Sequence, residues 1–200
     1  MLDEARLLAA LARPTGASSD YDLNPGVGLP AGARLRPAAV LVAIWQRDGV
    51  AHVVLTKRAS HLKHHPGQIA FPGGKIEEGD LGPEAAALRE AAEETGLDPA
   101  SVIVLGTLAP HETVTGFLVT PVLARIHADF APKADPSEVE EVFTVPLSHL
   151  LDPRHYTIQS RLWRGQMRRY YAVPWGPYYV WGATARILRG LADRVAHDSA

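Results

Sequence analysis

Apolar runs separated by short polar segments predict that strands dominate the centre of the chain. Residues 38–45 and 50–56 are two such runs, and the turn at residues 46–49 between them contains Asp48-Gly49, which is typical of a β-hairpin. Three further segments are rich in β-branched side chains and predict strands: residues 102–108, 117–126 and 139–145. A second hairpin is expected around residues 163–166. The fold proper is therefore expected to begin near Arg36.

Helical spacing of apolar residues appears near both ends of the chain. A short amphipathic helix is predicted from Leu2, Leu7, Leu8 and Leu11. A Pro/Gly-rich segment over residues 14–37 follows it and is expected to be a loop that wraps the fold. A short helix is expected at residues 146–151. The chain is expected to finish on a helix over residues 179–195, with a core-facing stripe formed by Ile187, Leu188, Leu191 and Val195.

One further helix is predicted between residues 83 and 96. Pro83 suits the first helical turn, and Gly96 suits the left-handed position that ends a helix. Leu88, Ala91 and Ala92 are its expected buried face. Mixed strands with helices on both sides predict an α/β fold, an α/β/α sandwich with a mixed β-sheet.

Composition favours a single domain over residues 1–200, with an N-terminal helix and wrapping segment at 1–35 and a core at 36–200. The 200 residues are 46% hydrophobic and 21% charged, which suffices for one substantial core. A formal charge of −2, without a long basic stretch, gives no general attraction to nucleic acid. The absence of cysteine excludes disulfides and thiolate catalysis.

The chain shows no sign of export or membrane insertion. Its first residues are acidic where a secretion signal carries positive charge. The longest uninterrupted apolar run, residues 38–45, is eight residues long, whereas a spanning helix needs about 20. We expect a cytoplasmic protein with no membrane partner.

Three glutamates crowd the predicted end of the helix that stops at Gly96. Glu93 and Glu94 fall in its last turn, where the helix dipole makes each carboxylate cost ~0.3–1 kcal/mol, and Glu90 repels Glu94 one turn away. Glu90, Glu93 and Glu94 are expected to share one helical face, where their hard oxygen ligands suit Mg²⁺ or Mn²⁺. The alternative is a solvated charged face on which Arg89 pairs with Glu93.

A double glycine immediately upstream favours the cation site. Gly73-Gly74 permits a metal or phosphate to approach the backbone because no Cβ intervenes. From Lys75 to Glu94 there are seven acidic residues against Lys75 and Arg89 alone, a formal charge of −5. Such a charge indicates a cation site or a strongly hydrated surface.

The segment from Gly74 through Arg89-Glu90-x-x-Glu93-Glu94-x-Gly96-Leu97 resembles the Nudix box of metal-dependent diphosphate hydrolases. It departs from the usual pattern by one extra residue between Gly74 and Arg89, by Asp80 near the expected first glutamate, and by the small Ala91. The resemblance implies the following roles: Glu90 and Glu94 as ligands of Mg²⁺ or Mn²⁺, the Gly73 carbonyl as a further ligand, Glu93 as part of the acidic cluster, and Arg89 as the residue that orients the glutamates.

Residues 55–74 resemble the motif that precedes the box in the coenzyme A diphosphatase branch of this family, which also has a longer box with an aspartate. The positions in register are Thr56, Arg58, Leu62, His65, Gly67 and Phe71 to Gly74. Cations precede the acidic site here, and a substrate with a diphosphate and a 3′-phosphate needs fixed basic groups. The expected substrate-binding residues are Lys57, Arg58, Lys63, His65 and Gly74. The alternative is a basic solvated loop that balances the acids, with His61, His64 and His65 as surface residues.

The resemblance implies hydrolysis of coenzyme A, or a derivative, to 3′,5′-ADP and 4′-phosphopantetheine or its acylated form. The general base is left open between Glu93 and Glu138, and Glu138 has an alternative role as a turn carboxylate. Two other functions stay open: hydrolysis of ADP-ribose or dinucleoside polyphosphates on the same fold, and a non-catalytic nucleotide-binding module. Neither the oligomeric state nor the preference for free, acylated or oxidised coenzyme A follows from the sequence.

An aromatic set near the C-terminus has no partner in these motifs. Its members are Trp163, Tyr170, Tyr171, Trp175, Tyr178, Tyr179 and Trp181. We expect them to pack in the core, with adenine stacking or a subunit contact as the alternatives.

Overall fold

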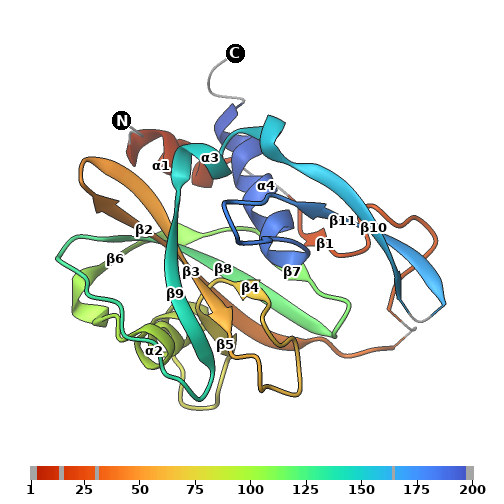
Figure 1. Cartoon of the computed structure of the whole chain (residues 1–200), viewed down its shortest axis with the longest axis horizontal. Helices are drawn as coiled ribbons and strands as arrows, with labels where there is room; N and C mark the ends of the chain where they lie inside the picture. The colour runs from red at the N-terminus through yellow and green to blue at the C-terminus, as the bar shows by residue number, and fades with distance from the viewer. Residues whose placement is uncertain (1–3, 14–15, 30–31, 164, 197–200) are drawn as a thin grey trace.

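A mixed sheet of nine strands organises the part of the chain that the structure, a computed structural model, describes: residues 4–13, 16–29, 32–163 and 165–196. At its centre β2 (Arg36–Arg47) pairs in parallel with β8 (Phe117–Ile126) and antiparallel with β3 (Val50–Arg58). The other strands of this sheet are β1 (Ser18–Ser19), β4 (Ile69–Ala70), β5 (Gly73–Lys75), β6 (Val102–Thr107), β7 (His111–Glu112) and β9 (Val139–Pro146). A separate antiparallel hairpin contains β10 (Thr157–Trp163) and β11 (Gln166–Ala172) and stands at the right of Figure 1.

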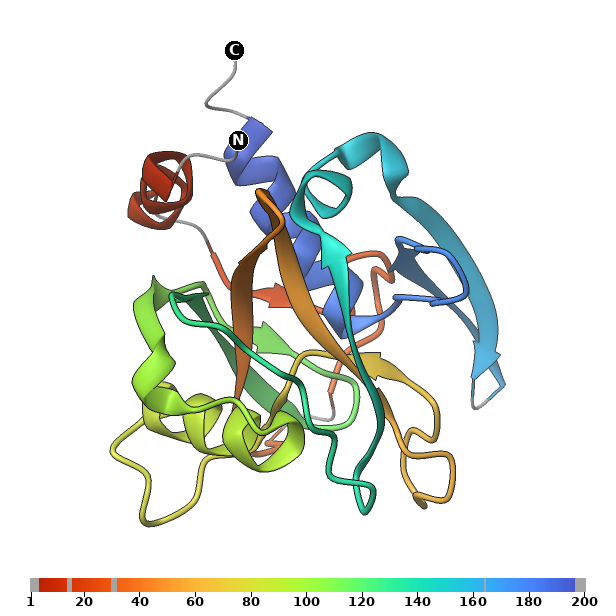
Figure 2. The same cartoon turned by 60° about the vertical axis from the view of Figure 1, so that its left-hand side comes forward.

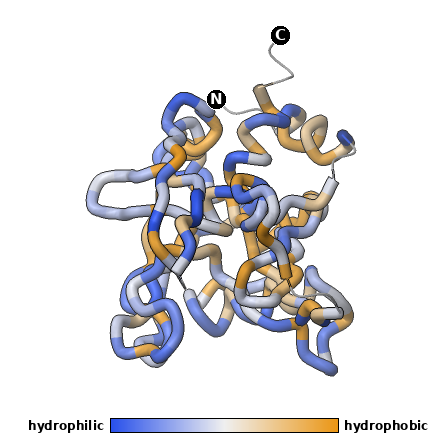
Figure 3. Tube along the Cα trace, turned by 90° about the vertical axis from the view of Figure 1, so that its right-hand side faces the viewer, coloured by the Kyte–Doolittle hydropathy of each residue, from blue (hydrophilic) through white to orange (hydrophobic). Residues whose placement is uncertain are grey.

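Helices cover both faces of the large sheet, which confirms the predicted α/β/α arrangement. One face carries α2 (Pro83–Thr95), and the other carries α1 (Glu4–Ala12), α3 (Leu147–Leu150) and α4 (Ala183–Ala196), as Figures 1 and 2 show. Two short 3₁₀ helices, Pro99–Ser101 and Pro153–His155, complete the elements. In Figure 3 hydrophobic stretches run through the interior of the molecule, and many of the outer loops are hydrophilic.

Alternation along β2 explains how one strand supports two cores. Ala39 and Leu41 belong to the cluster under α2, whereas Val42 and Ile44 belong to the cluster under α4. Successive side chains of a strand point to opposite faces, so an uninterrupted apolar run is the pattern of a strand that is buried on both sides. The small Ala39 lets α2 approach the sheet closely.

The predicted hairpin between β2 and β3 is confirmed, with strands longer than expected. Arg47 pairs with Val50, so the turn consists of Asp48 and Gly49 alone. Both have positive φ, 50° and 76°, as a type I′ turn requires. The predicted second hairpin is also present, with Trp163 opposite Gln166. Arg164 in its turn lies outside the described residues.

The last helix begins later than predicted, at Ala183 instead of residue 179. Residues 173–182 form a tight loop whose backbone bonds to itself: the N–H of Val173 donates to the carbonyl of Val180, and the N–H groups of Trp175 and Tyr178 donate to each other's carbonyls. Within the predicted helix, the Val180 carbonyl and the Gly182 N–H, which donates to the Tyr171 carbonyl, are therefore unavailable for helical hydrogen bonds. The predicted stripe of Ile187, Leu188, Leu191 and Val195 is buried, as expected.

The N-terminal segment is attached to the body at both ends. Helix α1 contacts α4, where the Arg6 guanidinium donates to the Val195 carbonyl at 3.3 Å. Strand β1 pairs with β7, and the fully buried His111 ring contacts Ser18 Oγ at 2.9 Å and Asp20 Oδ1 at 3.1 Å. Leu2, Pro14 and Pro30 lie outside the described residues, and the division of the chain at residue 35 stays a prediction. None of the described helices is long and apolar enough to cross a membrane.

Candidate functional site

Helix α2 has the bounds that its sequence predicts. It runs from Pro83 to Thr95, with Pro83 in its first turn. Gly96 follows in the left-handed conformation at φ 70°, and its N–H donates to the Ala92 carbonyl at 2.9 Å. A residue with a Cβ is strained at this φ, so Gly96 ends the helix directly after the glutamates.

The buried face of α2 differs from the predicted one. Ala86, Ala87 and Ala91 are fully buried against the sheet, whereas the predicted Leu88 and Ala92 are only partly buried. Alanines form the fully buried part of this contact because the helix lies close to β2, and Leu88 packs beside them. The stripe of Ala87 and Ala91 continues, at helical spacing, to Glu94.

Glu94 is therefore a buried carboxylate, which the sequence did not predict. The residue is 4% exposed, and its Oε2 accepts a hydrogen bond from the Gly73 N–H at 3.1 Å. Strand β5 brings Gly73 and Gly74 beside the helix because it pairs with β2 through Val40 and Ala39. A Cβ on Gly74 would collide with the Glu90 carboxylate. Gly74 thus leaves room for the Glu90 carboxylate, and Gly73 lets the strand lie against β2, where a Cβ would collide with Ala39 and Val40.

Burial and crowding make ionisation of these two carboxylates unfavourable. Burial raises the pKa of Glu94 to about 8; the Gly73 N–H and the Arg58 charge act against this, and the charges of Glu90 and Glu138 add to it. Burial also raises the pKa of Glu90, while Arg89 lowers it. A cation placed between the two would favour the ionised form of both.

Arg89 is the centre of a network on the solvent side of the helix. Its guanidinium donates twice to Asp80, through Nε and Nη2 at 3.1 Å each, and its Nη1 donates to Glu90 and Glu93 at 3.1 Å each. The hydrogen bonds from Arg89 and from the Glu77 N–H lower the pKa of Asp80. Arg89 and Asp80 together hold the loop before α2 against the helix.

The three box glutamates do not share one face, which corrects the prediction. The Glu93 side chain is 59% exposed and turns toward Arg89, whereas that of Glu90 is 16% exposed and Glu94 is buried. Glu94 and Glu93 are adjacent in sequence and therefore point about 100° apart around the helix. Glu90 and Glu94 form the pair that faces Gly73 and Gly74, while the Arg89–Glu93 pair that belonged to the alternative interpretation is also present.

Two more charged residues act on this site: Glu138, in the turn before β9, and Arg58, at the end of β3. The charge of Glu138 acts on both Glu90 and Glu94, and that of Arg58 acts on Glu94. Glu138 lies exposed in a turn, but the carboxylate that accepts from this turn's backbone is Asp135, which binds the Ser137 N–H at 2.9 Å. The carboxylate of Glu138 is therefore not needed for the turn.

The donor set fits a magnesium-like ion. Within the described ranges, no three acidic or histidine side chains converge as a complete cluster. Mg²⁺ commonly takes only one or two protein carboxylates and fills its other positions with water and substrate phosphates. Glu90, Glu94 and the glycine backbone supply only oxygen ligands beside a strand where no Cβ intervenes.

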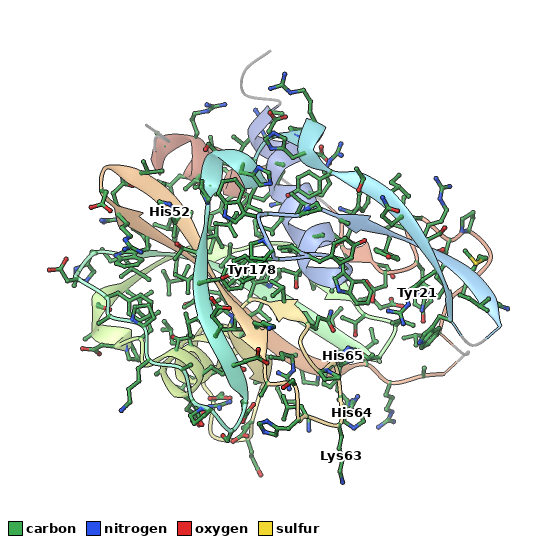
Figure 4. All side chains as sticks on the ribbon, viewed as in Figure 1. Tyr21, His52, Lys63, His64, His65 and Tyr178 are labelled. Atoms are coloured by element: carbon green, nitrogen blue, oxygen red, sulfur yellow. The ribbon has the colours of Figure 1, made fainter. Side chains whose placement is uncertain are left out.

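The other upstream cations predicted to bind substrate are not gathered at this site. The Lys57 ammonium lies 2.6 Å from Glu140 Oε1 in an ion pair. Lys63 and His64 extend from the lower edge of the molecule in Figure 4. His65 has a positive φ of 54° in the turn before Gly67, and it lines a pocket together with residues of β10 and β11.

That pocket has a volume of about 410 Å³ and lies under the β10–β11 hairpin. Its lining combines three arginines with aromatic rings and the turn that contains His65: Asp20, His65, Pro66, Gly67, Gln68, Val114, Thr115, Arg161, Trp163, Arg168, Arg169, Tyr170, Trp181 and Gly182. The expected core packing of the aromatic set is therefore wrong for Trp163, Tyr170 and Trp181. It is also wrong for Trp175 and Tyr179, which are exposed, whereas Tyr171 and Tyr178 are half-buried and pack against the core.

Comparison with known proteins assigns the chain to a family. The family model described as the NUDIX domain matches residues 35–164. The uncharacterized Nudix hydrolase NudL of Enterobacter sp. (strain 638) is 45% identical over 160 residues, which cover 80% of this chain and 83% of that protein. NudL of Escherichia coli (strain K12) is 43% identical over a segment of the same length and coverage.

A solved structure supports the architecture. The crystal structure of a MutT/nudix family protein from Enterococcus faecalis matches 86% of this chain and 66% of that chain, with a TM-score of 0.54 and 18% identity. At this identity the likeness concerns the fold alone, and it agrees with the mixed sheet between helices described above.

Proposed function

Because the chain belongs to the Nudix hydrolase family, whose members hydrolyse diphosphate bonds with divalent metal ions, we propose that it cleaves the diphosphate of coenzyme A or of its derivatives. Water is added across the P–O–P bridge, so the products are 3′,5′-ADP and 4′-phosphopantetheine, or the acylated form of the latter. A cytoplasmic location is part of this proposal.

The segment at residues 55–74 carries the proposal. Its resemblance to the coenzyme A motif continues without a gap into Gly73 and Gly74, whose backbone contacts Glu94 and Glu90. Arg58, within the same segment, is near enough to Glu94 to lower its pKa. One continuous stretch thus brings a basic group and the glycine strand to the acidic helix, which suits a substrate with several phosphates.

Glu90 and Glu94 would hold Mg²⁺ or Mn²⁺, with the Gly73 carbonyl as a further ligand; the bound ion supplies charge neutralisation of the diphosphate and acidifies a water. Arg58 would bind a diphosphate oxygen through its guanidinium. Gly74 leaves room for the Glu90 carboxylate beside the strand and presents its backbone to the substrate. No covalent intermediate on the protein is required.

Arg89 acts in this proposal as a positioning residue. Its hydrogen bonds to Asp80 and Glu90 fix the direction in which the Glu90 carboxylate points. Two carboxylates are candidates for the general base that removes a proton from water: Glu93, which is exposed beside Arg89, and Glu138, whose charge acts on both Glu90 and Glu94. We favour Glu138, because Glu93 is already engaged by Arg89.

Product analysis tests the function directly. The protein is incubated with Mn²⁺ or Mg²⁺ and, separately, with coenzyme A, dephospho-coenzyme A, ADP-ribose and a dinucleoside polyphosphate. We expect 3′,5′-ADP and 4′-phosphopantetheine from coenzyme A, and the highest kcat/KM for this substrate. Reaction in ¹⁸O-labelled water identifies the phosphorus that is attacked.

Two results would replace the proposal. Faster cleavage of ADP-ribose or a dinucleoside polyphosphate than of coenzyme A would assign a different Nudix activity. Tight binding of coenzyme A without metal-dependent turnover would identify a nucleotide-binding module.

A further inference from the structure

The pocket under the β10–β11 hairpin contains two arginines that form no ion pair with any carboxylate of the described residues. Arg161 and Arg168 are directly opposite each other across the two strands. Two like charges in this register repel each other. Among the residues that the structure describes, no carboxylate lies within ion-pair distance of either guanidinium.

Aromatic rings hold both arginines at the pocket wall. The guanidinium of Arg168 lies 4.8 Å from the Trp163 ring centre and 5.0 Å from that of Tyr21, and Arg161 lies 5.3 Å from that of Trp181. Arg168 is buried, at 8% exposure, whereas Arg161 is exposed. A buried guanidinium between rings, without an anionic partner, is a ready site for an anion.

The acid in the lining, Asp20, is committed elsewhere. Its Oδ1 contacts the His111 ring at 3.1 Å, and its Oδ2 accepts from the Val114 N–H at 2.9 Å. Asp20 thereby connects the N-terminal segment to the loop that forms one wall of the pocket. Its contacts are therefore with His111 and Val114, and among the described residues it forms no ion pair with Arg161 or Arg168.

The pocket is connected to the acidic site by a short stretch of chain. His65 to Gln68 line the pocket, and Gly73 lies against Glu94. The five residue steps from Gln68 to Gly73 span at most about 18 Å even when fully extended. A ligand of dinucleotide size can therefore occupy both places at once.

We propose that this pocket binds the 3′-phosphorylated adenosine end of the substrate. Arg161 and Arg168 bind the 3′-phosphate, and adenine stacks on an aromatic ring of the wall, with the partly exposed Trp181 as the candidate. Phosphate and aromatic base are the two chemistries that paired guanidinium groups and tryptophans recognise. This inference rests on the proposed function for the identity of the substrate, and it assigns the preference for the 3′-phosphate to the hairpin.

The test compares two arginine variants that leave the acidic site untouched. Arg161→Ala removes a guanidinium from an exposed strand position, so folding is expected to persist, and thermal melting verifies this. Arg47→Ala is the matched control, because Arg47 also lies over a tryptophan, 5.6 Å from the Trp45 ring centre, at the distant β2–β3 turn in Figure 1.

In Arg161→Ala we expect kcat/KM for coenzyme A to fall about 10–100-fold, the scale of losing one charged hydrogen bond. The value for dephospho-coenzyme A, which lacks the 3′-phosphate, should stay within about twofold. Calorimetry should show the same loss of affinity for adenosine 3′,5′-bisphosphate and none for 5′-AMP. Arg47→Ala should change none of these quantities.

Equal effects on coenzyme A and dephospho-coenzyme A, or no effect on either, would overturn the pocket assignment and leave the proposed hydrolysis intact. The two proposals can also fail in the opposite order. If the wild-type protein does not cleave coenzyme A but binds adenosine 3′,5′-bisphosphate in an Arg161-dependent way, the proposed function is wrong and the pocket is still a nucleotide site.

Discussion

The acidic site on α2 and the arginine pocket under the β10–β11 hairpin are built in opposite ways. The acidic site comes almost entirely from residues 73–94, one strand and the helix that follows it. The pocket is assembled from five separate parts of the chain, at residues 20, 65–68, 114–115, 161–170 and 181–182. A sequence motif can therefore reveal a site whose residues are close together in the sequence. It cannot reveal a site whose residues meet only in the folded structure.

The two regions share one physical feature. Each gathers like charges, Glu90 with Glu94 in one and Arg161 with Arg168 in the other, at a cost in folding stability that a ligand of opposite charge offsets. The acidic site would then determine turnover of any diphosphate, and the pocket would determine which diphosphate is preferred. The experiments below test this division of roles.

Glu94→Gln should produce the largest effect. The carboxamide keeps an acceptor for the Gly73 N–H but loses the negative charge, so we expect kcat to fall on the order of 10²–10⁴-fold. The loss should be equal for coenzyme A and dephospho-coenzyme A, because the acidic site does not contact the 3′-phosphate. Steady-state kinetics at saturating Mg²⁺ measures both.

Glu84→Gln is the matched control for that loss, since Glu84 is an exposed acid in the first turn of the same helix. Its activity should equal that of the wild type. Near-full activity of Glu94→Gln would remove Glu94 from the metal-binding pair.

Arg89→Lys should have the next largest effect. Lysine keeps the charge but cannot donate the paired hydrogen bonds that Asp80 accepts at 3.1 Å. We expect a loss of about 10–100-fold in kcat/KM and a weaker apparent affinity for Mg²⁺, as for other residues that orient metal ligands.

Arg154→Lys is the control, because Arg154 makes the same paired contact with Asp152 at an exposed position. Activity of Arg89→Lys equal to that of Arg154→Lys would mean that the Arg89 network only stabilises the loop.

Local signals explain why the helix and the hairpins were predictable. Pro83, Gly96 and Asp48-Gly49 each define a backbone conformation within a few residues. The burial of Glu94 was not predictable in this way. The buried stripe that leads to Glu94 contains only the alanines Ala87 and Ala91, which give a weak hydrophobic signal. The larger Leu88 gives a stronger signal, so the buried face was predicted on a different side of the helix.

The pocket left only an indirect signal. Arg161 and Arg168 are equally distant from the turn of the second predicted hairpin, so the register that places Trp163 opposite Gln166 also places them opposite each other. Their approach to His65, Asp20 and Trp181 depends on the packing of the hairpin beside the sheet, for which no local pattern exists.

The acidic site should also destabilise the metal-free protein in a defined pH range. The pKa of Glu94 is about 8 when folded against 4.5 ordinarily, so its ionisation favours unfolding. The contribution of Glu94 to the free energy of unfolding is fully present below pH 4.5 and is lost as the pH rises to about 8. Glu90, whose pKa is also raised, acts in the same direction. In EDTA at pH 8.5, the free energy of unfolding of Glu94→Gln should be higher than that of the wild type by on the order of 1–3 kcal/mol.

Thermal melting between pH 5 and pH 8.5 measures this difference. Adding Mg²⁺ should reduce the gap, because an ion that binds only the folded wild-type protein stabilises it. Parallel melting curves for the two proteins across this range would contradict the burial of a charged Glu94.

The smallest effect is expected at Lys57, and it separates two neighbours in the coenzyme A-like motif. Lys57 is held by Glu140 at the surface, so Lys57→Ala should leave kcat/KM within about twofold of the wild type, as exposed ion pairs contribute little. Arg58 instead lies close enough to lower the pKa of Glu94, and Arg58→Ala should reduce kcat/KM about tenfold or more for coenzyme A and dephospho-coenzyme A alike. Equal losses in the two variants would mean that the Lys57–Glu140 pair opens when substrate binds. The upstream segment would then act as one continuous basic surface that joins the acidic site to the arginine pocket.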